Sequence, residues 1–162
     1  MKNIAILYTN YSPLIDAIKY QLSDYEVICL TIPADMDKYD MVINLGVEYD
    51  GEALACHHSL LPAFDTEEPA KDAILSGVKV TGVTVYYTKS KKIIAQYPVF
   101  INNDMHFDQL EQELKYLEQV LFPIAIHKIL NNEPIDIRRL LNTPCGSNCG
   151  SKHTGGCRGC SH

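Results

Sequence analysis

The chain has 162 residues, of which 46% are hydrophobic and 21% charged, and its formal net charge is -6. This composition is ordinary for a globular protein, and the negative charge argues against a broad surface for nucleic acid or an anionic membrane. No apolar run approaches the roughly 20 residues that cross a bilayer, and the start of the chain lacks the apolar stretch of a secretory signal. We therefore expect a cytoplasmic protein with a small-molecule ligand and neither nucleic acid nor membrane as partner.

The first third of the chain contains buried-strand patterns and one helix. Strands are expected over residues 3–8, 27–32 and 41–45. A helix is expected over residues 12–22, where Ser12 is suited to cap it and Pro13 occupies its first position. Only residues 32–40 separate the second and third strands, which predicts a short connection there.

The remaining elements are expected to be a strand, a helix, two strands and a long helix, followed by a tail. The long helix is expected over residues 106–130, because apolar residues recur there at helical spacing. They are Leu110, Leu114, Leu117, Leu121 and Ala125. Strands alternating with helices favour an α/β fold with a Rossmann-like, mostly parallel sheet. We expect this domain over residues 1–140 and a small Cys-rich metal-binding tail over residues 141–162.

The most informative segment covers residues 55–62 and reads Ala-Cys-His-His-Ser-Leu-Leu-Pro. It resembles the Asn-x-His-Pro-Ser-Leu-Leu-Pro signature of the folate-dependent formyltransferases, closest to their phosphoribosylglycinamide formyltransferase branch. Further blocks that resemble the family follow in the family's order at residues 69–77, 81–85, 93–99 and 118–123. The resemblance covers residues 55–130 and implies a helix at the first of these blocks and strands at the next two.

The resemblance also implies which residues carry the chemistry. In the family an asparagine stabilises the oxyanion of the tetrahedral intermediate, a histidine handles protons and an aspartate orients them. Ala55 stands at the position of the asparagine, and His57 stands at that of the histidine. The loop of residues 86–92, where the family has its aspartate, contains no carboxylate. His57 is thus the predicted catalytic residue, and His58, which replaces a proline of the signature, is the second candidate.

Two further segments bear on anionic ligands. In the family, the turn after the first strand carries a Gly-Ser-Asn run that holds the substrate phosphate at a helix amino terminus. Here the turn over residues 9–13 has no glycine, which favours a plain helix cap over a phosphate site. A small basic cluster consists of Lys89, Lys91 and Lys92. It can be a solvated turn, or it can contact an anionic ligand or partner, and the sequence leaves both interpretations open.

The chain changes character after Asn142, where aliphatic side chains stop and cysteine and glycine become frequent. Four cysteines have the spacing C-x3-C-x7-C-x2-C, and they are Cys145, Cys149, Cys157 and Cys160. Two thiolates a few residues apart can hold one metal ion while glycines take the tight turns. We therefore predict a metal site in the tail.

Zinc and an iron–sulfur cluster are equally weighted alternatives for the metal centre. Zinc would use the four thiolates, or exchange one of them for His153, whereas a cluster would use all four. Disulfides are disfavoured in a reducing compartment, and free thiols are the remaining alternative. Cys29 lies in a buried-strand pattern and is interpreted as a core thiol, and strand alternation places Cys56 on the face opposite His57.

Two classes of function follow from these patterns. The first is a divergent enzyme that transfers or hydrolyses a formyl group or a related one-carbon unit through His57; 10-formyltetrahydrofolate is its cofactor if the family's activity is retained. The second is a non-catalytic protein of the same fold, whose role is metal or cluster binding, sensing or partner docking. A homodimer or a protein partner contacted through the tail is a further expectation.

Overall fold

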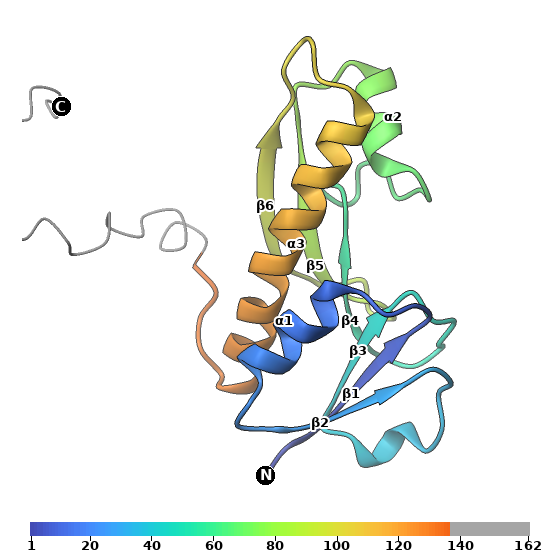
Figure 1. Cartoon of the computed structure of the whole chain (residues 1–162), viewed down its shortest axis with the longest axis vertical. Coiled ribbons are helices and arrows are strands. Elements are labelled where there is room, and N and C mark those ends of the chain that lie inside the picture. Colours follow the sequence, from blue (N-terminus) through green and yellow to red (C-terminus); the bar gives the residue numbers. More distant parts are fainter. Residues whose placement is uncertain (137–162) are drawn as a thin grey trace, which may run out of the picture.

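The computed structural model describes residues 1–136 as an α/β fold around one six-stranded sheet, whose strand order is β2-β1-β3-β4-β5-β6 (Figure 1). The strands are β1 (Asn3–Tyr8), β2 (Glu26–Leu30), β3 (Met41–Leu45), β4 (Leu54–His57), β5 (Val80–Tyr87) and β6 (Ile93–Phe100). The helices are α1 (Pro13–Gln21), α2 (Pro69–Ser76) and α3 (Phe107–Leu130), with a short 3-10 turn, η1 (Met36–Lys38). The expected order of elements is confirmed, with bounds that differ by a few residues.

The sheet is mixed, which corrects the expectation of a mostly parallel one. β2, β1, β3 and β4 are parallel, whereas β5 runs antiparallel to β4 and to β6. The β5–β6 pair is joined by a tight turn, which the Tyr87 N–H closes on the Lys92 carbonyl at 3.0 Å, whereas β4 and β5 are joined through α2. Strands joined by so short a turn pair antiparallel, because a parallel pair needs a crossover.

The main hydrophobic core lies between the sheet and two helices, α1 and α3, which pack side by side on one face (Figure 1). Ile4, Ile6 and Ile43 point into it from the parallel strands and are fully buried. The predicted apolar stripe of α3 is confirmed, since Leu110 and Leu114 are also fully buried. Such burial contributes roughly 1.5–3 kcal/mol per large apolar side chain, so α3 anchors both halves of the sheet.

The opposite face of the parallel half is covered by chain connections instead of helices. The β2–β3 connection contains only η1, and residues 46–53, which join β3 to β4, form no helix. A smaller apolar cluster lies under these connections and consists of Leu7, Val42 and Ala53, with Leu30, Met36, Tyr39, Val47 and Tyr49 packed against it. A parallel pair usually needs a crossover of a dozen or more residues, so the β3–β4 joint is unusually short.

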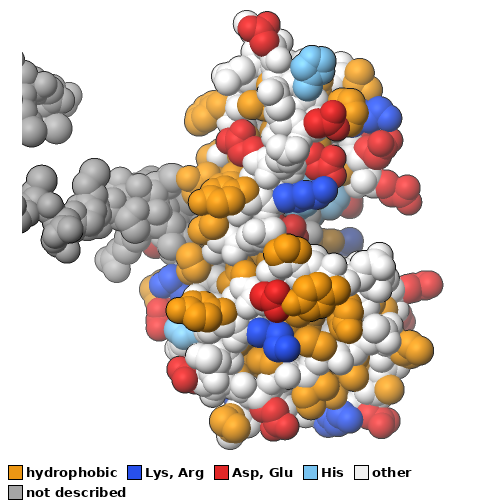
Figure 2. All heavy atoms as spheres, in the orientation of Figure 1, with side chains coloured by type: hydrophobic (Ala, Val, Ile, Leu, Met, Phe, Trp, Pro, Cys, Tyr) orange, Lys and Arg blue, Asp and Glu red, His pale blue; other side chains and the backbone are white. Residues whose placement is uncertain are grey.

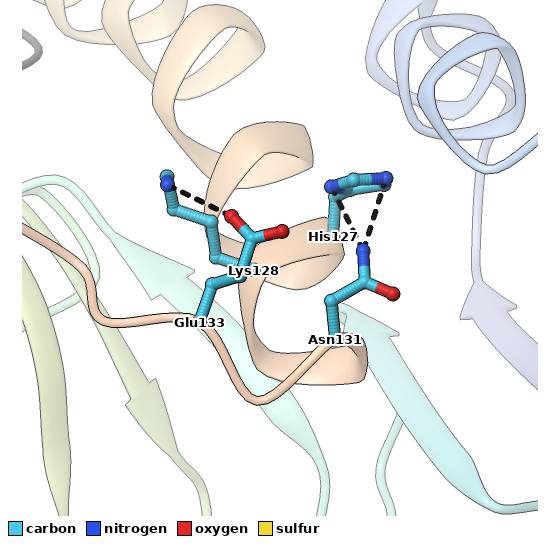
Figure 3. A network of polar contacts seen from close by, with 4 residues as sticks. All are labelled: His127, Lys128, Asn131 and Glu133. Carbon is cyan, nitrogen blue, oxygen red and sulfur yellow. Dashed lines mark hydrogen bonds and ion pairs between the residues drawn. The ribbon is translucent and has the colours of Figure 1, made fainter.

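The carboxyl end of α3 is tied to the start of the sheet. The Lys2 ammonium donates to the Leu130 carbonyl at 2.6 Å, and the Tyr25 hydroxyl donates to Asn131 Oδ1 at 2.9 Å. Figure 3 shows two further pairs at this end. Lys128 and Glu133 form an ion pair at 3.2 Å, and Asn131 Nδ2 lies 3.2 Å from His127 Nε2. Cationic side chains in the last turn suit the negative end of the helix dipole.

Two further expectations concern the predicted tail and the absence of a membrane-crossing segment. The predicted boundary at residue 140 and the whole predicted tail lie outside them. None of the helices within residues 1–136 is both long and apolar enough to cross a membrane. Acidic, basic and hydrophobic side chains are interspersed on the face shown in Figure 2, which displays no continuous basic patch there.

Candidate functional site

A cleft of about 410 Å³ opens at the carboxyl ends of the parallel strands. Its walls come from the turn after β1, from the end of β3, from β4, β5 and the start of their hairpin loop, and from α3. The lining residues are Asn10, Ser12, Leu14, Asn44, Leu45, Gly46, Ala55, Cys56, Tyr86, Thr88 and Glu118. In open α/β sheets, ligands bind outside the carboxyl ends of the strands where the strand order reverses. Here the reversal falls between β1 and β3, so this cleft is the candidate site.

The turn after β1 forms the helix start that the sequence predicts, but without one expected contact. Ser12 stands at the N-cap position in an extended conformation, and Pro13 follows in the first turn. The Ser12 side chain makes no capping hydrogen bond within the described residues, although it was expected to do so. The Ser12 hydroxyl lines the cleft instead, where it can serve a ligand.

His57 is held by a local hydrogen bond at the end of β4. Its Nε2 atom lies 2.9 Å from the Phe64 carbonyl oxygen. A carbonyl only accepts, so Nε2 carries the proton and Nδ1 is the acceptor of the neutral ring. His57 is not among the residues that line the cleft. The structure thus places the predicted catalytic residue at the strand end, with one nitrogen already engaged.

His58 forms an ion pair with a residue of the cleft wall. Its Nε2 atom lies 2.9 Å from Glu118 Oε2, and Glu118 itself lines the cleft from α3. Both side chains are largely buried, with exposed fractions of 21% and 17%. In the sequence, Glu118 begins the last block that resembles the family, and this position was the available signal for a site residue. The pair joins the loop after β4 to α3.

A polar network fixes the loop that follows β4. The Thr84 hydroxyl donates to the Ser59 carbonyl at 2.6 Å and accepts the Leu61 N–H at 3.0 Å. Gln96 Nε2 donates to the Leu61 carbonyl at 2.8 Å and to the Thr84 hydroxyl at 3.1 Å. Three blocks of the resemblance therefore meet in one network, whose effect is to position the segment that carries His57 and His58.

Gly82 is required where β5 passes under that loop. A Cβ atom at this position would lie 2.0 Å from the Tyr97 carbonyl oxygen and 2.7 Å from Leu60 Cδ2. No other residue fits so close an approach without a shift of the backbone. Gly82 thus allows β5 to pack closely against Tyr97 of β6 and against Leu60 of the loop.

The β5–β6 turn replaces the loop where the family has its aspartate. The Glu52 carboxylate accepts the N–H groups of Lys89 and Ser90 at 2.9 and 3.3 Å. Lys91 places its ammonium 5.4 Å from the centre of the Tyr86 ring. The turn is thus held by the segment before β4, and no carboxylate of the turn itself reaches the cleft, because its sequence contains none.

Cys56 lies in the cleft wall, on the core side of β4, as alternation with His57 predicted. Burial raises the pKa of its thiol well above the usual value, and the Glu118 carboxylate raises it further. The thiol is therefore neutral near physiological pH, and a thiolate nucleophile at this position is disfavoured.

We expect slow alkylation of Cys56 in the folded protein. Because its pKa is raised, the thiolate fraction stays small at about pH 8 and increases about tenfold per pH unit until the raised pKa is reached. Iodoacetamide labelling of the Cys56 peptide, followed by mass spectrometry, is expected to be more than about tenfold slower than in concentrated urea. Equal rates in the two conditions would contradict the raised pKa.

The described residues contain no group of three or more His, Cys, Asp or Glu side chains placed to hold a metal ion. Cys29 and Cys56 are both free thiols, and Cys29 packs against the core as expected. The predicted ligands Cys145, Cys149, Cys157 and Cys160, and the alternative His153, lie outside the described residues.

The sequence profile of the formyl transferase family matches residues 43–126, just over half of the 162 residues. This chain belongs to the formyl transferase family. It is 31% identical over 128 residues to phosphoribosylglycinamide formyltransferase of Bacillus subtilis, a match that covers 76% of this chain and 64% of that relative. The enzyme of the same name from Mycobacterium tuberculosis (strain ATCC 25618 / H37Rv) is 29% identical over 113 residues, 61% of this chain and 53% of that relative. The resemblance to the phosphoribosylglycinamide formyltransferase branch is thus confirmed.

A solved structure shows the same fold. The crystal structure of phosphoribosylglycinamide formyltransferase from Bacillus halodurans superposes with a TM-score of 0.64 at 24% identity, and the match covers 80% of this chain and 95% of that one. This chain spans less than two thirds of the length of the two curated relatives from Bacillus subtilis and Mycobacterium tuberculosis. It shares the family with the curated relatives and the fold with the solved structure.

Proposed function

We propose that this formyltransferase-family chain binds a formyl compound or a related small molecule in the cleft and transfers formyl groups far more slowly than its relatives. The observation that carries this proposal is Ala55. It lines the cleft at the position where the family signature has its asparagine. A methyl group donates no hydrogen bond, so the oxyanion of a tetrahedral intermediate lacks that donor.

His57 is the proposed proton-transfer residue, with His58 as the second candidate. The Phe64 carbonyl engages His57 Nε2, which leaves Nδ1 as the acceptor. The Glu118 carboxylate orients His58 in the same way. A histidine held by a second group is the usual arrangement for general acid–base chemistry, which supports the assignment. The absence of an aspartate in the β5–β6 turn supports a low rate.

The size of the cleft bears on the cofactor. Small-molecule sites range from roughly 300 to 1,000 Å³, and this cleft measures about 410 Å³. This volume lies near the lower end of that range. In the family, 10-formyltetrahydrofolate supplies the formyl group, and we propose it as cofactor only for the activity that remains.

The expected result with 10-formyltetrahydrofolate and glycinamide ribonucleotide is a turnover about a hundredfold to a thousandfold below that of a family enzyme. This is the usual effect of losing one oxyanion donor, and the missing aspartate acts in the same direction, although such losses do not add. Product formation by the purified chain, measured beside the phosphoribosylglycinamide formyltransferase of Bacillus subtilis, tests it. A normal turnover would show that another group replaces the asparagine.

Two variants at Ala55 distinguish the effect of a hydrogen-bond donor from that of side-chain volume. Ala55→Asn supplies an amide donor in the cleft wall, whereas Ala55→Leu fills a similar volume without one. We expect Ala55→Asn to increase the rate by about tenfold or more over Ala55→Leu. Equal rates would place the developing negative charge away from residue 55 and would weaken the assignment of the cleft.

The second candidate is a non-catalytic role in metal or cluster binding, sensing or partner docking, which the spacing of the four C-terminal cysteines favours. A homodimer or a protein partner contacted through residues 141–162 belongs to this candidate. A chain that carries metal and shows no formyl transfer, even as Ala55→Asn, would favour it. Light scattering of the full chain and of residues 1–140 tests the oligomer.

A further inference from the structure

The charge of the cleft bears on the chemistry of its ligand. Among its lining residues, Glu118 is the single side chain with a formal charge, and neither lysine nor arginine lines it. The Lys91 ammonium stands near the Tyr86 ring but is not part of the lining. A ligand in the cleft therefore meets one negative charge and otherwise neutral polar groups.

Some of these polar groups are already engaged, and others have capacity to spare. Asn44 bonds to the backbone of Gly46 and Val47, and the Thr88 hydroxyl bonds to Gly51 and Ala53. These two side chains shape the wall. Within residues 1–136, neither Asn10 nor Ser12 makes a side-chain hydrogen bond, so both can serve a ligand.

Glu118 lines the cleft and uses only one of its two carboxylate oxygens within residues 1–136. Oε2 is bonded to His58, whereas Oε1 has no hydrogen-bond partner within the described residues. The same carboxylate raises the pKa of Cys56, so its negative charge acts on the cleft wall. A half-buried carboxylate with a spare oxygen suits an ammonium group.

The amino terminus of α1, which faces the cleft, is poorly suited to an anion. Pro13 contributes no N–H, and the Ile15 N–H already donates to the Ser12 carbonyl at 3.0 Å. Asp16 in the first turn offsets the positive end of the helix dipole. The turn over residues 9–13 also lacks a glycine that would let a phosphate approach the backbone.

We propose that the ligand of this cleft is a small polar molecule that carries an amine and no phosphate group. The amine would bind at Glu118 Oε1, and hydroxyl or amide groups of the ligand would bind Asn10 and Ser12. This inference rests on the proposed function, because it names the acceptor class for the same cleft. It excludes a phosphorylated ribonucleotide as the acceptor that this chain uses.

Three matched probes test the proposal on the full chain, namely glucosamine, glucosamine 6-phosphate and glucose. They share one ring and differ in the amine and the phosphate. Dissociation constants come from the amide NMR shifts of Asn10, Asn44 and Gly46 at low ionic strength. We expect glucosamine to bind at least about tenfold more tightly than either of the other two.

Two variants on α3 test whether the charge of Glu118 causes the preference for the amine. Glu118→Gln keeps the shape of the side chain and removes the charge, so the preference for the amine should be lost. Glu113→Gln is the matched control, because Glu113 lies on the same helix, is exposed and does not line the cleft. It should leave all three constants unchanged.

The outcomes that overturn the proposal are distinct. Binding of glucosamine 6-phosphate at the cleft as tight as that of glucosamine overturns the inference and leaves the cleft as a ligand site. If Lys91→Gln then removes that binding, Lys91 is the cation that holds the phosphate. A preference for glucosamine that survives Glu118→Gln overturns the role of Glu118. No shift of the cleft amides with any probe overturns the inference, and the proposed function then depends on the formyl-transfer assay alone.

Discussion

Anaerobically purified full-length protein is expected to contain about one metal centre per chain, as zinc or as an iron–sulfur cluster. The proposed ligands are Cys145, Cys149, Cys157 and Cys160. Structural metal binding can contribute on the order of 10 kcal/mol, which is the largest single effect we expect in this protein. Elemental analysis measures the metal, and a visible absorption spectrum distinguishes a cluster from colourless zinc.

Replacing any one of the four cysteines by serine should lower the metal content, because a site of four ligands loses one of its bonds. Cys29→Ser is the matched control and should leave the content unchanged, since Cys29 packs against the core. His153→Ala separates the two ligand sets, because loss of metal would include His153 among the ligands. Protein that carries no zinc, iron or other transition metal would contradict the proposal.

Thr84→Val is expected to destabilise the fold by about 2–4 kcal/mol. Thr84 is fully buried, and its hydroxyl serves the Ser59 carbonyl, the Leu61 N–H and the Gln96 amide. Valine has nearly the same shape but leaves those groups without their partner, and each buried polar group left unsatisfied costs about 1–3 kcal/mol. Urea unfolding followed by circular dichroism measures the change in the free energy of unfolding.

Thr81→Val on the same strand is the control. Thr81 is 1% exposed, and its hydroxyl has no hydrogen-bond partner within the described residues. Replacing an unpartnered buried hydroxyl by a methyl group removes a penalty, so this variant should be neutral or more stable. An equal loss of stability in both variants would show that valine fits poorly in β5 and that the network is not the cause.

The fold was predictable where the pattern of buried residues is local. The limits of β1 and β3 agree with the sequence prediction, because short apolar runs bounded by polar turns define them. The direction of β5 and β6 was not predictable in this way, since an apolar run has the same pattern in a parallel and an antiparallel strand. The short turn that makes β5 and β6 antiparallel depends on backbone contacts such as that of Tyr87 with Lys92.

The candidate site was predictable in part. The resemblance around residues 55–62 located the strand end that carries His57, and the structure places that end beside the cleft. The engagement of His57 by Phe64 was not foreseeable, because it depends on how the loop folds back, with Phe64 at φ 51°. Glu118 was missed as a lining residue because it lies 60 positions after its partner His58.

The helix-free joint between β3 and β4 has a consequence for how this chain can change length. Loop-closure entropy grows slowly, at only about 0.6 kcal/mol for each doubling of a flexible loop. β3 and β4 pair through Ile43 and Leu54, and residues 46–53 make no strand of their own. Extra residues placed there would leave the ladder of the sheet intact. The joint is thus a point at which the fold can gain or lose a segment above the cleft while the strands that form its floor keep their register.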